Sequence, residues 1–181
     1  MGPFGVGGFA TLHSFIDSDG SQPGAGLVQA SDGNFYGTTW QGGASGCGTL
    51  FQITPAGTLT TLYNFNCTTN GGQPYGRPMQ HTNGKLYATN GVGKVFSLNV
   101  GLGPFVKTLP TSAVLGARVT ILGTNLTGAT IVSFAGTAAI FTVVSSTEIT
   151  TTVPAGATTG KVRVVTPGGT FSSDVKFRVV P

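Results

Sequence analysis

The chain of 181 residues carries 9 Lys and Arg against 5 Asp and Glu, which gives a formal net charge of +4, and only 8% of its residues are charged. A hydrophobic content of 39% supports packed cores and argues against an intrinsically disordered chain, while 30 glycines with abundant Thr and Val favour strands and turns over helices. No run of roughly 18 apolar residues occurs, so we expect no membrane-spanning helix.

The N-terminus does not form an intact signal peptide, because residues 1–5 lack both a basic segment and a long apolar core. The low charge and the Thr-, Ser-, Asn- and Gly-rich composition are nevertheless typical of a secreted protein. A removed leader, or numbering from the mature start, would account for both observations. Residues 5–8 follow no strand and open no helix, so their glycines do not predict a phosphate-binding loop.

Two stretches of the chain are copies of one another. Residues 20–39 recur as residues 71–90, with a constant offset of about 51 residues. Residues 11–15 likewise recur as residues 61–65. A period of this size indicates a repeat architecture, in which one unit cannot bury its apolar face alone.

Each repeat reads as a run of short antiparallel strands. Asp32-Gly33 and Asn83-Gly84 separate the first two strands of the units, and these dipeptides favour a two-residue type I′ turn. Four strands in about 50 residues match the size of a propeller blade. The expected strands are residues 26–30, 34–39, 48–53 and 59–65 in the first unit and residues 77–81, 85–89 and 93–98 in the second.

The strands do not balance between the two units. Residues 9–15 have the pattern of a fourth blade strand, whereas the second unit lacks its fourth strand and continues into the glycine-rich residues 99–103. Two blades cannot close a ring, and open edges favour aggregation. We therefore predict strand exchange between copies, which gives a ring if the rotation between copies closes and an open filament if it does not, and we favour the open filament. The expected donors are Phe9, Leu12 and Phe15, and the expected acceptors are Val95, Phe96 and Leu98.

The two cysteines, Cys47 and Cys67, are predicted to form a disulfide. Residues 54–57 form a turn between the third and fourth strands, so pairing of these strands brings both cysteines to the open end of one hairpin. Two free buried thiols are the alternative. We expect no metal site, because His13 and His81 do not lie at ligand spacing from either cysteine.

Catalytic motifs are absent, so neither an enzyme nor a cofactor is expected. No pair of facing carboxylates is visible, and neither histidine lies in a nucleophile motif. Residues 17–20 briefly resemble a calcium loop, although a turn is the preferred interpretation. Residues 66–68 and 125–127 match glycosylation sequons, and they too are best explained as turn residues.

The aromatic residues form a candidate sugar-binding surface. Tyr36 and Tyr87 are repeat-equivalent, so packing explains them best, and Tyr63 and Tyr75 belong to the same aromatic group. Trp40 differs, because its counterpart in the second repeat is a glycine. Trp40 is therefore the candidate for ligand contact.

The repeat half resembles the GloVer-type tandem repeat of secreted bacterial proteins. The phrases that carry the resemblance are LHSF, SDGSQPGAGLVQASDGNFYGTT and GCGTLFQITPAGTLTTLYNF, and they cover about residues 9–100. The resemblance implies a bacterial extracellular protein with blade-like units. It implies no particular activity.

The remaining residues predict an immunoglobulin-like sandwich. Short alternating strands are separated by turn signals, for example at residues 123–125, 154–156 and 167–169. The phrases GARVTILGTNLTG and TEITTTVPAGATTGKVRVVTPGG resemble the IPT/TIG domain over residues 104–181. In bacterial extracellular proteins such a domain implies a spacer or an interaction module. No counterpart of its DNA-contacting loops is recognisable, so nucleic-acid binding is not expected.

Taken together, the sequence predicts an all-β protein with two propeller-blade-like, four-stranded repeat units in residues 1–103 and an immunoglobulin-like β-sandwich in residues 104–181. The expected function is non-enzymatic self-assembly of a secreted structural protein from copies of itself. The alternative is an extracellular carbohydrate-binding or adhesion module, with the sandwich as a spacer.

Overall fold

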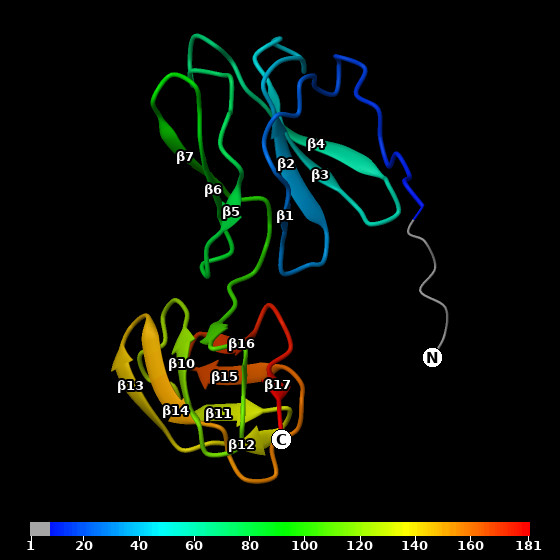
Figure 1. Cartoon of the computed structure of the whole chain (residues 1–181). Helices are drawn as coiled ribbons and strands as arrows, with labels where there is room; N and C mark the ends of the chain where they lie inside the picture. The colour runs from blue at the N-terminus through cyan, green and yellow to red at the C-terminus, as the bar shows by residue number, and fades with distance from the viewer. Residues whose placement is uncertain (1–7) are drawn as a thin grey trace. The chain divides into compact units, whose positions relative to one another are not determined.

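The structure is a computed structural model that describes residues 8–181, and these residues contain strands and turns but no helix (Figure 1). The expectations about a signal peptide in residues 1–5 and a phosphate-binding loop in residues 5–8 concern positions that lie wholly or largely outside the described residues. The chain divides into two compact units, made of Met1–Gln29, Gly33–Pro78 and Ala88–Phe96 and of Ala30–Asp32, Met79–Tyr87 and Ser97–Pro181. The boundary at residues 103 and 104 stays a prediction.

The first repeat forms the predicted four-stranded antiparallel sheet, in the order β1-β2-β3-β4. Buried side chains of β2 and β3, above all Tyr36, Leu50 and Phe51, form its apolar core. A bulge in the β3–β4 pairing places Leu50 opposite Tyr63 and Phe51 opposite Thr61. The strands are β1 (Val28–Gln29), β2 (Phe35–Thr39), β3 (Thr49–Ile53) and β4 (Leu59–Asn64).

The second repeat forms a three-stranded sheet in the order β5 (Met79–Gln80), β6 (Leu86–Thr89) and β7 (Val95–Leu98). Among residues 8–181, no strand pairs with the outer side of β7, as expected from the glycine-rich residues that follow it. This strand is therefore an edge, and the Val95 side chain on it is 76% exposed.

The turn type predicted for the two repeats is wrong. Gly33 and Gly84 have φ values of 86° and 87°, but Asp32 and Asn83 before them are not left-handed. In the second repeat, the Gly84 amide donates to the His81 carbonyl at 2.9 Å. The loops are longer than two residues, and such hairpins use a type I turn followed by one left-handed residue, which glycine adopts without strain.

Residues 9–15, predicted as a strand, pair with no strand among the described residues. The Phe9 side chain is 96% exposed, and Leu12 is also exposed. The Leu12 main chain lies close to Gly57, in the turn before β4, but residues 9–15 form no ladder there among the described residues. The expected role of these residues in another copy's sheet stays a prediction.

The IPT/TIG-like half forms a β-sandwich, as predicted (Figure 1). One sheet has the order β13-β14-β10-β8, a second has the order β12-β11-β15-β16, and β17 pairs with β9 in parallel. Val119, Ile121, Val162 and Val164 point inward and are fully buried, whereas Arg163 is exposed. The strands are β8 (Lys107–Leu109), β9 (Ser112–Ala113), β10 (Arg118–Leu122), β11 (Ile131–Phe134), β12 (Thr137–Ala138), β13 (Phe141–Ser145), β14 (Glu148–Thr152), β15 (Val162–Thr166), β16 (Gly169–Ser172) and β17 (Arg178–Val179).

Candidate functional site

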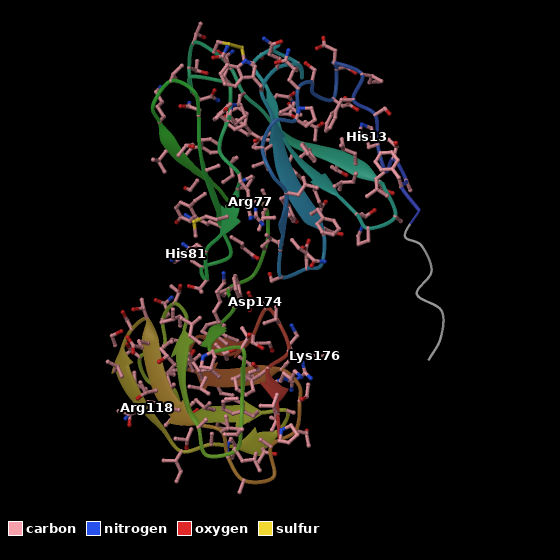
Figure 2. The ribbon with its side chains drawn as sticks, viewed as in Figure 1. His13, Arg77, His81, Arg118, Asp174 and Lys176 are labelled. Carbon is pink, nitrogen blue, oxygen red and sulfur yellow. A yellow bond between two sulfur atoms is a disulfide. The ribbon has the colours of Figure 1, made fainter. Side chains whose placement is uncertain are left out.

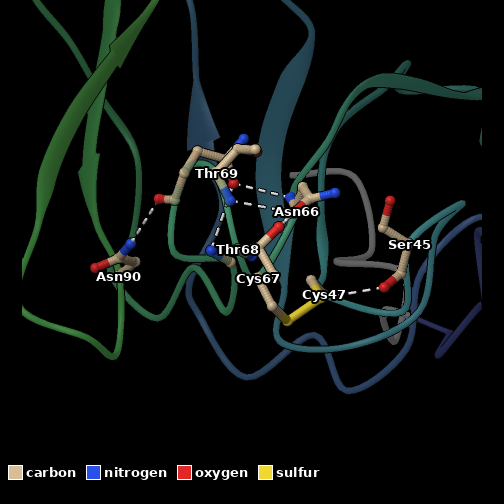
Figure 3. The surroundings of a disulfide bond; sticks show 9 residues. Ser45, Cys47, Asn66, Cys67, Thr68, Thr69 and Asn90 are labelled. Carbon is tan, nitrogen blue, oxygen red and sulfur yellow. Dashed lines mark hydrogen bonds between the residues drawn. A yellow bond between two sulfur atoms is a disulfide. The ribbon is translucent and has the colours of Figure 1, made fainter.

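The predicted disulfide between Cys47 and Cys67 is present (Figure 3). Its Cα atoms lie 5.6 Å apart, at the open end of the β3–β4 hairpin. The Cys47 carbonyl accepts a hydrogen bond from the Gln73 amide at 2.7 Å, and Gln73 opens the second repeat. The disulfide holds Cys67 at the open end of the hairpin, and the Gln73 hydrogen bond joins the start of the second repeat to the same place.

The segment beside the disulfide is a compact turn (Figure 3). The Asn66 carboxamide oxygen accepts hydrogen bonds from the amides of Thr68 at 2.9 Å and Thr69 at 3.2 Å. It also accepts from the Thr68 hydroxyl at 2.6 Å. Such an Asx turn is a common use of asparagine, and here the first sequon forms part of it.

Trp40 follows β2 and lies against the second repeat. Its amide donates to the Gln22 carbonyl at 3.1 Å, and the equivalent Gly91 amide donates to the Gln73 carbonyl at 2.9 Å. The main chain is thus the same in both repeats, but the side chains differ. A Cβ at position 91 would lie 3.0 Å from Cη2 of Trp40, so the indole occupies space that only a glycine leaves open.

A small pocket opens beside this indole. Its volume is about 140 Å³, and it is lined by Gln22, Gly24, Ala25, Trp40, Pro74 and Tyr75. Trp40 is half-buried, whereas Tyr75 is 69% exposed. The two rings stand edge to face, with centroids 5.5 Å apart and planes at 84°. The loops of both repeats therefore contribute to one aromatic recess.

The pocket offers apolar surfaces and an amide but no charged side chain. Gln22 is part of the lining, and its carboxamide donates to the Gln41 carboxamide at 3.1 Å. An amide can donate and accept at once, and rings such as indole and phenol combine apolar faces with one polar group. The arrangement suits a neutral ligand that has both apolar faces and hydroxyl groups.

The segment that resembled a calcium loop is held by hydrogen bonds instead. His13 Nε2 lies 2.7 Å from the Asp19 carboxylate, and the Ile16 amide donates to the same carboxylate at 3.0 Å (Figure 2 shows His13). Partial burial acts to raise the pKa of Asp19, but these hydrogen bonds and the attraction of His13 outweigh it and lower the pKa. Among residues 8–181, no three His, Cys, Asp or Glu side chains gather into a possible metal site.

The expected strand-exchange residues lie apart from the pocket. Phe15 packs edge-on against Phe51 with ring centroids 5.1 Å apart, and Phe96 packs in the same way against Phe65 at 5.0 Å. Leu98 is half-buried.

In the described part of the chain, no helix is long and apolar enough to cross a membrane.

The sequence singled out Trp40 but missed most of its surroundings. The sequence pattern groups Tyr75 with the other aromatic residues without linking it to Trp40, and it does not point to Gln22 or Pro74 as ligand contacts. One signal was available, because Tyr75 aligns with Gly24 just as Trp40 aligns with Gly91. Both aromatic rings are positions at which the two repeats differ.

Comparison with known families agrees with this architecture. Residues 4–110 match the model of the Gloeobacter/Verrucomicrobia repeat, and residues 104–179 match the IPT/TIG domain. The chain belongs to the Gloeobacter/Verrucomicrobia repeat family. It also carries an IPT/TIG domain, so the resemblance of both halves is confirmed.

Similarity to solved structures is weak. A crystal structure with a xylogluco-oligosaccharide has a TM-score of 0.37 and 18% identity, and the match covers 72% of this chain and 36% of that one. SGBP-B from a complex xyloglucan utilization locus in Bacteroides uniformis has a TM-score of 0.36 and 14% identity, with 71% and 35% covered. The chain spans about a third of the length of these structures. Similarity at this level carries no argument about fold or ligand. No curated protein matches this chain.

Removal of the disulfide is expected to destabilise the repeat half. The bridge closes a loop with a sequence separation of 20, for which a contribution of about 2–4 kcal/mol is typical. Urea unfolding followed by the fluorescence of Trp40, the single tryptophan, should show this loss in the Cys47→Ser/Cys67→Ser variant. A reductant should destabilise the wild type but leave the double variant unchanged. Equal stability of the oxidised wild type and the variant would contradict the expectation.

Gly91→Ala is expected to displace the Trp40 indole. The added methyl group would stand 3.0 Å from the ring, which is closer than side chains normally approach. The emission of Trp40 should shift to longer wavelength, and acrylamide should quench it more strongly. Gly103→Ala is the matched control, since a Cβ there meets nothing within 4 Å. An unchanged spectrum in Gly91→Ala would show that the indole does not rest on Gly91.

Proposed function

We propose that this protein is a non-enzymatic, extracellular carbohydrate-binding module whose site is the Trp40 pocket. The observation that supports this most directly is the perpendicular pair of Trp40 and Tyr75 at the edge of a recess of about 140 Å³. Pockets that bind small molecules are mostly apolar and contain a few placed polar groups. The lining of this pocket has that composition.

The two rings and the amide have complementary roles in this proposal. A sugar ring has C–H faces that stack on aromatic rings and hydroxyl groups that need hydrogen-bond partners. One aromatic ring serves as the floor and the other as a wall, while Gln22 supplies a donor and an acceptor. The small volume suits a single sugar ring, with the rest of a saccharide outside.

The chemistry of the lining supports binding rather than catalysis. None of its residues is Asp, Glu, His or Cys, so the pocket offers no carboxylate pair, imidazole or thiol. The disulfide supports an extracellular location, because such bonds persist in oxidising compartments. In this proposal the IPT/TIG sandwich is a spacer.

Trp40→Ala is expected to weaken glycan binding at least tenfold, about 1.4 kcal/mol, because the stacking surface is lost. A glycan array with the whole chain identifies the ligand, and titration calorimetry with that glycan measures the affinity. Ile140→Ala is the matched control, since it removes an exposed apolar side chain of the sandwich, outside the pocket and outside the proposed strand-exchange surfaces. An array without any bound glycan, or equal affinity of Trp40→Ala and wild type, would refute the proposal.

We propose a second function, self-association of the repeat half, on a separate observation. The sheet edge at β7 and the segment of residues 9–15 both lack a partner strand among the described residues. Unpaired edges of this kind promote pairing with another chain.

Light scattering after size-exclusion chromatography tests self-association. The mass is expected to rise with concentration above the 18.3 kDa of one chain. Growth without limit is expected for a filament, and a fixed limiting mass would indicate a closed ring instead. A monomer at every concentration would exclude self-association and leave the carbohydrate proposal untouched.

A further inference from the structure

We propose that residues 9–14 of one copy add to β7 of a second copy as its missing outer strand, in the register that β4 has on β3. This inference rests on the second proposed function, and it names the surface and the residue pairs. It does not depend on carbohydrate binding, because the pocket residues take no part in it.

The acceptor edge is the counterpart of a strand that is covered in the first repeat. Residues 48–53, which contain β3, align with residues 93–98, which contain β7. In the first repeat's sheet, β3 lies between β2 and β4, whereas in the part of the chain that the structure describes β7 pairs with β6 alone. Leu50 is fully buried, but its counterpart Val95 is 76% exposed. The vacant strand position thus leaves an apolar side chain open to solvent.

The donor segment is the counterpart of β4. Leu12 and Phe15 align with Leu62 and Phe65. Directly after β4, Phe65 packs edge-on against Phe96, with ring centroids 5.0 Å apart. Phe15 packs in the same way against Phe51, the counterpart of Phe96, at 5.1 Å. Phe15, which directly follows the donor segment, therefore already has the packing position that Phe65 has directly after β4.

A polar contact repeats alongside these rings. Asn70 Nδ2 donates to the Tyr63 hydroxyl at 2.7 Å, and the counterpart residues His13 and Asp19 are joined at 2.7 Å. The Asn70 carboxamide also accepts a hydrogen bond from the Asn66 amide at 2.8 Å. In the same way, the Asp19 carboxylate accepts one from the Ile16 amide at 3.0 Å. Residues 13–19 reproduce the side-chain contacts made by the end of β4 and the turn after it, and only the strand pairing of residues 9–14 is missing.

The order of the repeats points to a second copy as the partner. The fourth strand belongs to the sheet of one repeat, and the phenylalanine after it packs on the next repeat, as β4 and Phe65 show. Phe15 packs on the first repeat, so residues 9–14 belong on the sheet of a repeat that precedes it. The vacant edge at β7 belongs to the second repeat. The β7 edge of a second copy is an edge of this kind, and copies joined in this way would be arranged head to tail.

The observed β3–β4 pairing fixes the register. Leu50 lies opposite Tyr63, Gln52 opposite Thr60 and Ile53 opposite Leu59, with Leu62 in a bulge. Transfer to the equivalent positions places Val95 opposite His13, Ser97 opposite Ala10 and Leu98 opposite Phe9, with Leu12 in the bulge. The apolar pair of Leu98 and Phe9 then replaces that of Ile53 and Leu59, and Phe9, now 96% exposed, becomes covered.

Cysteine cross-linking tests both the partner and the register. Ala10→Cys and Ser97→Cys are made as separate single variants, mixed and mildly oxidised, while the two native cysteines are already joined. Both positions are exposed, so the substitutions should not disturb folding. We expect a disulfide-linked dimer of the two variants, because residues directly opposite in antiparallel strands come within disulfide reach.

The control replaces the donor position by one that is out of register. Gly8 lies two residues from Ala10 on the same side of the donor strand. A mixture of Gly8→Cys and Ser97→Cys should therefore cross-link much less than the mixture of Ala10→Cys and Ser97→Cys. Equal cross-linking of both mixtures would overturn the register. Self-association without any cross-link would overturn this interface but not the second function. An Ala10→Cys/Ser97→Cys double variant that cross-links only within one chain would overturn the second copy as partner.

Removal of residues 1–12 provides a second measurement. The shortened chain keeps His13 and Phe15, which pack on the first repeat, but loses most of the donor strand. Its mass in light scattering should stay at one chain at concentrations where the intact chain associates. Association as before would overturn the inference.

Discussion

The fold of the repeat half depends on the packing contact between the end of one repeat and the next repeat. β4 completes the sheet of the first repeat, and Phe65 directly after it packs against Phe96 of the second. A single blade-like sheet buries too little apolar surface to be stable by itself, so the repeats need this contact in order to fold. The Cys47–Cys67 bridge lies at the same place and limits how far the second repeat can move from the first hairpin. The Arg77 guanidinium adds a hydrogen bond to the Leu27 carbonyl at 2.9 Å.

The candidate pocket lies at the junction of the two repeats, at positions where their side chains differ. Main-chain hydrogen bonds from Trp40 to Gln22 and from Gly91 to Gln73 keep the two repeats alike. The absence of a side chain at position 91 lets the indole lie across the junction, and Tyr75 replaces a glycine on the facing loop. The pocket is therefore a property of two adjacent repeats that differ from one another. Neither repeat could form it alone.

Much of the architecture could be predicted because it follows from local patterns. Alternation in residues such as Val162 and Val164 revealed the sandwich strands, and the hairpin around residues 54–57 brought Cys47 and Cys67 together. The turn type was not predictable from the dipeptide alone, because the number of loop residues decides whether Asp32 takes a left-handed conformation. Gln22 and Pro74 were missed for another reason. They join Trp40 only through the packing of two loops that are far apart in sequence.

The two proposed functions reinforce one another if both hold. Head-to-tail addition at β7 would create a new junction between the second repeat of one copy and the first repeat of the next. At that junction the positions of Trp40 and Tyr75 are taken by Gly91 and Gly24, so no second pocket of this kind would form. Each chain then contributes one pocket, and an assembly presents many at regular intervals. Weak binding at each pocket would become strong binding to a polysaccharide with repeated units, because every site after the first binds at a high effective concentration.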